Sequence, residues 1–269
     1  MSWEDKEILL AVKTYPERSK KYGNTVCTAG ILMDSNEWVR IYPINFDSYK
    51  AKPLKKFVQF KAQIRKNTKE MLKRKESYNI RDSTIEVTKI DLVDPSIKGV
   101  WDKRRNILEK TLSDSIESLE ASNKEKRTSL GIVKPKLNTL KFKLKKPIEK
   151  IEIDIAKDIQ MNLFGEKLQK VDKIEKIFYY SFKCGGNDCS GHKMICTDWE
   201  LLQSFRKWKE KYTDPEILEE KLRKKYEDWM KKRDLHFILG THNRFGTWFI
   251  IGLFYPPKRQ ARALNDFFK

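Results

Sequence analysis

Three of the four cysteines and one of the three histidines lie together in residues 184–196. They follow the spacing C-x4-C-x2-H-x3-C, and the glycines between them let the backbone turn tightly. Thiolate and imidazole groups at short spacings are the ligands that tetrahedral zinc has in structural sites. The stretch therefore predicts one structural zinc ion, with the candidate ligands Cys184, Cys189, His192 and Cys196.

Other interpretations of the same stretch stay open. Cys184 and Cys189 could form a disulfide in an oxidising setting, and Cys196 follows Met194-Ile195, where a thiol can be a small buried apolar group. If Cys196 is not a ligand, His242 in a later turn is a candidate in its place. A shell of three cysteines and one histidine leaves no open position on the metal, so the predicted role is structural.

The elements that must position this turn are a strand over 176–183 and a helix from about 198 to 211. A second helix follows Asp214-Pro215, and two apolar strands cover 236–240 and 248–255. We expect residues 166–269 to form a mixed domain that the zinc turn holds together.

Residues 1–95 favour a β-rich domain. Apolar and polar side chains alternate, or apolar runs end at turn residues, in five segments. The segments are 7–13, 25–33, 38–42, 57–65 and 85–93. Five short strands in so short a domain are typical of a small twisted sheet or a partial barrel.

Residues 96–165 form the third predicted part. Apolar side chains recur at helical spacing from Trp101 to Leu119, and a strand with alternating lysines covers 140–146. A connection reaching residue 165 follows. The predicted fold class is therefore α+β, with a β-rich N-terminal half and a mixed C-terminal half that carries the candidate zinc turn.

The chain has 57 Lys and Arg against 38 Asp and Glu, a formal net charge of +19. Such a surplus attracts polyanions, and nucleic acid is the commonest of them in cells. The candidate phosphate contacts are Arg40, Lys61, Arg65, Lys66, Lys73, Arg74, Lys141, Lys143 and Lys145. A solvated loop, a lysine-rich edge strand or pairing of Arg40 with Glu37 or Asp47 would explain the same residues without nucleic acid.

Catalytic motifs are missing from the sequence. It contains no G-x-x-x-x-G-K-[ST], G-x-G-x-x-G after a strand, G-x-S-x-G or H-E-x-x-H. A two-metal nuclease would need clustered carboxylates, and the candidates are Glu152 and Asp154 with Lys157, or Asp198 with Glu200. Because Asp198 and Glu200 are two residues apart at a helix start, we expect their side chains to diverge.

The longest apolar run, residues 248–255, is far shorter than the roughly 18 residues of a membrane span. The N-terminus has no hydrophobic signal region. We therefore expect a cytoplasmic protein without a membrane partner.

The motifs VCTAG at 26–30 and WVRIYPI at 38–44 resemble those of an uncharacterised prokaryotic family. The resemblance extends over nearly the whole chain, through residues 13–23, 128–135, 162–164, 198–200 and 252–258. It implies no catalytic motif. The basic, lysine-rich, archaeal character is more loosely similar to accessory proteins associated with argonautes in prokaryotic antiviral defence.

The leading hypothesis is a non-catalytic accessory subunit that contacts RNA or DNA within a larger cytoplasmic complex. The similarity to argonaute-associated proteins implies an argonaute or another nuclease-like protein as its partner. The alternatives are a metal-dependent nuclease and a scaffold that binds only proteins.

Overall fold

The structure is a computed structural model that describes residues 2–19, 23–45, 52, 54–68, 74–148, 152–153, 176–186, 189–242 and 246–259. Four residues of the sequence-based predictions, Asp47, Lys73, Asp154 and Lys157, lie outside the described residues. So does most of the connection that we expected to end at residue 165.

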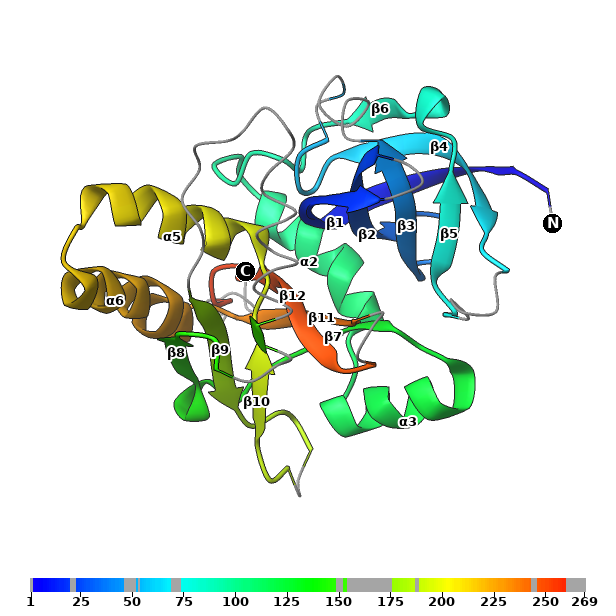
Figure 1. Cartoon of the computed structure of the whole chain (residues 1–269). Coiled ribbons are helices and arrows are strands. Elements are labelled where there is room, and N and C mark those ends of the chain that lie inside the picture. The colour runs from blue at the N-terminus through cyan, green and yellow to red at the C-terminus, as the bar shows by residue number, and fades with distance from the viewer. Residues whose placement is uncertain are drawn as a thin grey trace, which may run out of the picture.

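Six strands form the N-terminal sheet. They are β1 (Glu4–Ser19), β2 (Gly23–Leu32), β3 (Trp38–Asn45), β4 (Gln59–Lys66), β5 (Ser77–Ile80) and β6 (Glu86–Lys89). Because β1 pairs with both β2 and β4, the first five close into a ring in the order β1-β2-β3-β5-β4-β1 (Figure 1). The pair β3–β5 is parallel, and the other pairs of the ring are antiparallel. The predicted β-rich N-terminal half is confirmed, and its sheet is a barrel.

Strand β1 closes the barrel because it is long enough to pair with two strands, β2 and β4. Glu4–Leu9 pair with β4, whereas Ile8–Ser19 pair with β2. Successive side chains of a strand point to opposite faces. Ile8 and Leu10 therefore lie in the barrel interior, while Leu9 and Ala11 lie on its outer face.

The outer face of the barrel is also apolar and is covered. Ala29, Ile31 and Trp38 on β2 and β3 share one hydrophobic cluster with residues of the C-terminal half, among them Ile132 and Ile238. Buried apolar side chains thus form an interface that joins the two halves.

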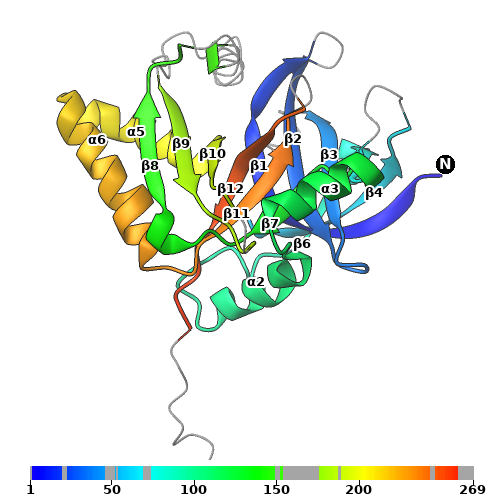
Figure 2. The same cartoon turned by 90° about the horizontal axis from the view of Figure 1, so that it is seen from below.

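Two three-stranded sheets make up the C-terminal half. Their strands are β7 (Leu130–Val133), β8 (Lys141–Lys145), β9 (Ile177–Phe182), β10 (His192–Ile195), β11 (His236–Thr241) and β12 (Trp248–Phe254). The sheet orders are β10-β9-β8 and β12-β11-β7. Figure 2 shows β11 and β12 between the barrel and the sheet of β8, β9 and β10. With the helices, this confirms the α+β class.

The helices are α2 (Val100–Leu108), α3 (Ile116–Lys126), α5 (Trp199–Lys211) and α6 (Pro215–Arg223). Asp198 and Asp214 cap the last two, as their sequences predict. No helix within the described ranges is long and apolar enough to cross a membrane.

The prediction of one continuous helix through Trp101 to Leu119 is wrong, because the segment forms two helices, α2 and α3. Ser115 starts a new helix, because its Oγ accepts the N–H of Ser118 at 3.1 Å and Ser118 Oγ accepts the N–H of Ser115 at 3.3 Å. This reciprocal capping box satisfies the free N–H groups of a helix start. Leu112, before it, forms a bridge to Ile132 of β7 instead.

The buried interface gives a direct stability prediction. Ile238 is fully buried in the cluster that joins the two halves, whereas Ile90 is 65% exposed. We expect Ile238→Ala to lower the free energy of unfolding by about 2–5 kcal/mol, because it removes buried methyl groups and leaves a cavity. Ile90→Ala, the matched control, should change it by less than about 0.5 kcal/mol. Equal effects in chemical denaturation would contradict this packing.

Candidate metal centre and basic surfaces

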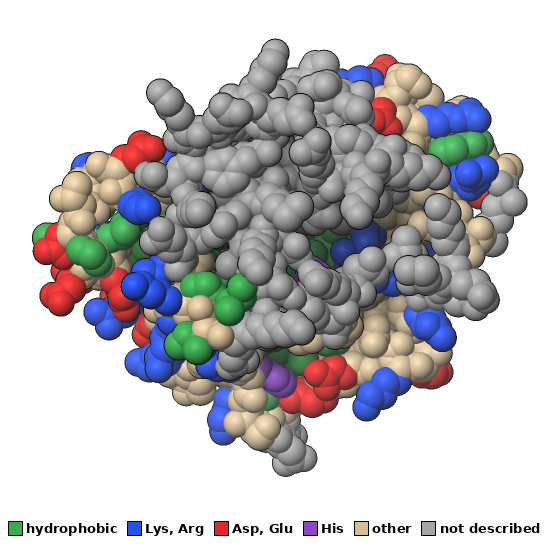
Figure 3. All heavy atoms as spheres, viewed as in Figure 1, with side chains coloured by type: hydrophobic (Ala, Val, Ile, Leu, Met, Phe, Trp, Pro, Cys, Tyr) green, Lys and Arg blue, Asp and Glu red, His purple; other side chains and the backbone are tan. Residues whose placement is uncertain are grey.

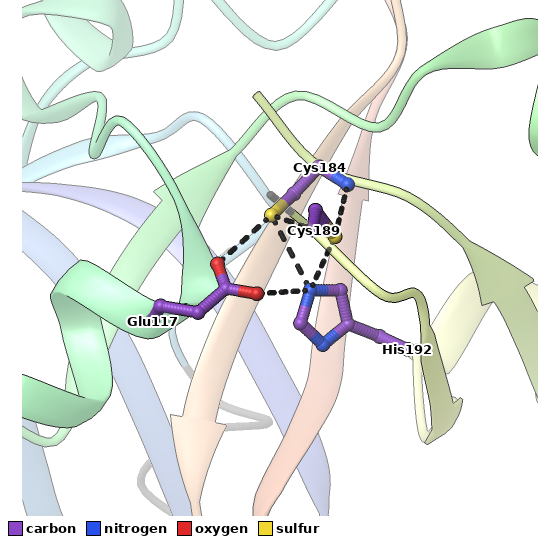
Figure 4. A group of neighbouring side chains, drawn as sticks. All are labelled: Glu117, Cys184, Cys189 and His192. Carbon is purple, nitrogen blue, oxygen red and sulfur yellow. Dashed lines mark hydrogen bonds and ion pairs between the residues drawn. The ribbon is translucent and has the colours of Figure 1, made fainter. Parts of the chain in front are cut away.

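Four side chains converge beside the β9–β10 turn: Glu117, Cys184, Cys189 and His192 (Figure 4). The two Sγ atoms are 3.6 Å apart. His192 Nε2 lies 3.3 Å from Cys184 Sγ and 3.2 Å from Cys189 Sγ. Glu117 places one oxygen 3.2 Å from Cys184 Sγ and the other 3.2 Å from His192 Nε2. This group could hold a metal ion.

These separations suit a tetrahedral site. With metal–sulfur bonds of about 2.3 Å and metal–nitrogen or metal–oxygen bonds of about 2.0–2.2 Å, ligand atoms of a zinc tetrahedron lie about 3.3–3.8 Å apart. The Sγ–Sγ separation and the two Nε2–Sγ separations, 3.2–3.6 Å, are close to those values, and a Glu117 oxygen lies 3.2 Å from Cys184 Sγ. The donor set, two thiols with an imidazole and a carboxylate, is also one that zinc accepts.

Local backbone features bring the four ligands together. Glu117 lies in the first turn of α3, whose start Ser115 fixes. Gly185 passes so close to this start that an added Cβ would lie 2.6 Å from the Asp114 carbonyl oxygen. The main-chain N–H of Cys184 donates to Cys189 Sγ at 3.3 Å, and this hydrogen bond orients the Cys189 sulfur.

Cys196 is not part of this group, so its prediction as a ligand is wrong. Residues 192–195 form strand β10, and four residues of strand span about 13 Å, which separates Cys196 from His192. Its N–H donates to Phe178 O at 2.8 Å, and its thiol is buried. The alternative fourth ligand, His242, is also elsewhere, with its ring 5.4 Å from that of Phe249.

Glu117 takes the fourth place, and sequence reasoning missed it. The residue is distant from the cysteine turn along the chain, and a glutamate in a first helical turn is ordinary. Cys184 and Cys189 are both free thiols. Burial raises the pKa of the Cys184 thiol.

A second group of possible ligands, Glu109, Asp234 and His236, already contains cations. Lys134 Nζ lies 3.4 Å from Glu109 Oε1 and 3.2 Å from Asp234 Oδ1. Arg105 also bonds Asp234. The ammonium and guanidinium groups already neutralise the carboxylates of Glu109 and Asp234. We therefore describe this cluster as a network of ion pairs that joins α2, β7 and β11.

The predicted phosphate contacts on β4 lie on the barrel surface. Lys61 is exposed between Glu7 on β1 and Glu86 on β6. The Arg65 guanidinium lies 4.8 Å from the ring of Trp3, and Arg81 lies 4.5 Å from the same ring. Sequence reasoning missed Trp3 and Arg81, because the barrel pairing alone brings them beside Arg65.

Arg40 and Arg74 point into the junction between the two halves. Arg40 Nη2 donates to Ser129 O at 3.1 Å, and Arg74 Nη2 donates to Thr241 O at 3.2 Å. The bond of Arg40 is thus to a main-chain carbonyl and not to the carboxylate of Glu37, and Asp47 lies outside the described residues. Their main observed role is to join the barrel to β7 and β11.

The lysines of β8 form a separate surface. Lys141, Lys143 and Lys145 share the outer face of the sheet with Lys193 of β10, because Lys141 and Lys193 both lie opposite Ser181. Lys141 pairs with Glu227 at 3.5 Å and Lys145 pairs with Glu152 at 2.7 Å. Figure 3 shows Lys and Arg side chains over both halves of the molecule, so the positive charge is not confined to one element.

Asp198 and Glu200 line one pocket together with Lys13 and Lys56, between β1 and the start of α5. The expected divergence of the two carboxylates is thus incomplete. Each carboxylate oxygen of Asp198 accepts a main-chain N–H group, one from Leu201 and the other from Leu253, both at 3.0 Å. Burial raises its pKa to about 6, against the opposing effect of the Lys56 ammonium.

Comparison with known families places the chain. Residues 112–268 match a domain of unknown function, DUF8757. This match covers more than half of the 269 residues of the chain. The chain belongs to the DUF8757 family. Residues 4–110 match a second domain of unknown function, DUF8758. No curated protein matches the chain.

All four metal candidates lie in the DUF8757 part, and the barrel lies in the DUF8758 part. The two matches meet between α2 and α3. The borders that we expected after residues 95 and 165 stay predictions.

Asp198 predicts an unusual pH dependence of stability. Its folded pKa of about 6 exceeds the usual 3.8, so between pH 4 and 6 the folded state binds a proton that the unfolded chain does not. Raising the pH through this window should therefore lower the free energy of unfolding, by on the order of 2–3 kcal/mol. Asp198→Asn should remove this slope.

The measurement is chemical denaturation at several pH values, read as the difference between the natural protein and Asp198→Asn. Subtraction removes the slopes of the other carboxylates. A difference that stays constant from pH 4 to 6 would show that Asp198 is ionised throughout.

Proposed function

We propose that this protein contacts nucleic acid through its barrel, as a non-catalytic subunit of a larger assembly. The strand order β1-β2-β3-β5-β4-β1 supports this most. A five-stranded Greek-key barrel of this kind is the oligonucleotide- and oligosaccharide-binding (OB) architecture, in which the β1–β2 and β4–β5 loops contact the ligand. In this chain the β4–β5 connection carries the basic stretch that the sequence singled out.

The flanks of that connection have cationic side chains that such contact needs. Arg65 and Lys66 end β4 and Lys75 precedes β5, whereas the Arg74 guanidinium bonds Thr241 O in the junction. Lys66 Nζ lies 4.5 Å from the ring of Tyr78, and Trp3 lies beside Arg65. Cations beside aromatic rings suit a phosphate chain with stacked bases.

The packing of the barrel limits where a strand of nucleic acid would lie. The outer face of β2 and β3, which OB barrels use for ligands, is covered here by β7 and β11. The proposed contact is therefore at the barrel end that carries the β4–β5 connection. A contact surface limited to one end of the barrel is small, and it suits a subunit that binds nucleic acid together with another protein.

The proposal extends to that other protein. The looser similarity to argonaute-associated proteins favours an argonaute or another nuclease-like partner in an antiviral complex in the cytoplasm. Co-purification with such a partner would support this part. The proposal that a scaffold binds only proteins predicts a partner without nucleic acid.

The nuclease alternative has one observation in its favour. Asp198, Glu200, Lys13 and Lys56 meet in a pocket, and carboxylates beside lysine are the side chains of metal-dependent nucleases. Against it, both oxygens of Asp198 already accept main-chain N–H groups.

We further propose that the metal of the Glu117–Cys184–Cys189–His192 group is zinc and that it is structural. Four protein ligands close the shell, as in structural zinc sites. The ion would fix the β9–β10 turn to the start of α3.

Nucleic-acid binding is tested with the triple variant Lys61→Gln, Arg65→Gln and Lys66→Gln. For a labelled single strand, we expect roughly tenfold weaker binding at low salt and a salt slope smaller by about 2, because three phosphate contacts are lost. The control is the triple variant Lys207→Gln, Lys209→Gln and Lys232→Gln, which removes equal charge from α5 and from the turn that precedes β11.

Equal losses in both variants would point to net charge alone, and no binding by the natural protein would contradict the proposed function. The same strands are incubated with magnesium and with manganese. Cleavage by the natural protein that is absent in Asp198→Asn would favour the nuclease alternative.

Zinc is tested by metal analysis of the purified protein. We expect about one zinc per chain, lost in Cys184→Ser and weakened in Glu117→Gln, because each variant removes a ligand. Cys196→Ala is the control and should keep its zinc. Zinc lost from Cys196→Ala and kept by Glu117→Gln would reverse the ligand assignment.

A further inference from the structure

Arg127 ends α3 in a backbone conformation that suits glycine. Its φ and ψ are 56° and 32°, in the left-handed region. Helices commonly end this way, but with glycine or asparagine, because the Cβ of other residues crowds the next carbonyl oxygen. Non-glycine residues in this region are worth explaining, since local strain is often retained where a side chain has a function.

The Arg127 side chain is exposed, and no contact of its guanidinium with the described residues stabilises the fold. Among the described residues, no side chain forms an ion pair or hydrogen bond with its guanidinium. Lys124 and Lys126 already place positive charge at the negative end of the helix dipole. Compensation of the dipole therefore does not require a third cation there.

Arg127 lies directly beside the return of the β4–β5 connection. The Lys75 N–H donates to Arg127 O at 3.1 Å, and Lys66 Nζ donates to Lys75 O. The main chains of Lys75 and Arg127 therefore meet at the junction of the two family domains, and four cationic residues lie along the chain there, namely Lys66, Lys75, Lys126 and Arg127. We call this group the seam patch.

Among the described residues, one acidic neighbour of the seam patch is turned inward and two others pair with its lysines. Glu76, next to Lys75, is buried and accepts the Ser129 N–H at 3.0 Å and the Ser129 hydroxyl at 2.8 Å. At the surface, Glu37 pairs with Lys75 at 3.3 Å and Glu125 lies 3.6 Å from Lys126. The four cations exceed these two surface carboxylates, and Arg127 has neither as a partner.

Both ends of α3 are fixed to other elements. Glu117 joins its first turn to the metal group, and Arg127 O accepts from Lys75 at its end. About ten residues of helix, roughly 15 Å, therefore hold Arg127 in a set position. A side chain on a fixed element loses less freedom on binding than one on a loop.

We propose that the seam patch is a second contact for the phosphate backbone of nucleic acid, with Arg127 as its principal residue. This inference rests on the proposed function, and it extends the contact from the barrel onto the DUF8757 domain. Guanidinium is suited to such a contact, because its fork of N–H groups matches two phosphate oxygens. A strand bound at the β4–β5 connection would continue over the end of α3.

The test is Arg127→Gly, because binding and folding should then change in opposite directions. The glycine relieves the left-handed backbone, so we expect the midpoint of thermal unfolding to stay equal or rise. Binding of labelled oligo-dT and oligo-U should weaken on the order of threefold at low salt, and the salt slope should fall by about 0.7. Arg127→Lys should keep the salt slope.

One control variant, together with the natural protein, separates the outcomes. Lys98→Gln removes an exposed cation from the turn before α2 and should leave binding unchanged. If the natural protein binds both strands but Arg127→Gly binds them equally well at every salt concentration, the seam patch is overturned and the barrel contact stands. If the natural protein binds neither strand, the proposed function itself fails. Weakening for one strand only would show whether DNA or RNA is the ligand.

Discussion

The rest of the structure depends on one apolar interface, the outer face of β1, β2 and β3 packed against β7, β11 and β12. Because Leu9, Ile31 and Trp38 are buried there with Ile132 and Ile238, the two family domains share a hydrophobic core. The same contact covers the outer face of β2 and β3, so that face is not open to a ligand. It also orders the polar junction, in which Arg40 and Glu76 bond Ser129.

Helix α3 links the two features of greatest functional interest. Its start contributes Glu117 to the metal group, and its end meets the β4–β5 return at Arg127. A metal at the first end would therefore stabilise the position of the second, although the ligands themselves are far from the proposed nucleic-acid contact. In the proposed function, a zinc ion at the start of α3 would support Arg127 at its end, and rigid support of a binding residue lowers the entropy cost of binding.

Local patterns in the sequence predicted local features well. Cys184, Cys189 and His192 were found because their spacing is short, and the caps Asp198 and Asp214 because they precede apolar periodic segments. Features that depend on distant residues were missed. Glu117 joins the metal group only through the packing of α3, and Trp3 meets Arg65 only through barrel closure. Cys196 was assigned as a ligand because of its spacing, whereas it follows strand β10 as a buried thiol, which was the alternative interpretation.

The central claim, contact with nucleic acid at the barrel end, is tested most directly by hydrogen–deuterium exchange with and without a saturating single-stranded oligonucleotide. Exchange reports local opening along the whole main chain, so it locates a ligand without assuming a site. The account predicts slower exchange at the end of β4, the start of β5 and the end of α3. Slower exchange confined to β8, β9 and β10 would contradict it and assign the contact to the lysines of that sheet.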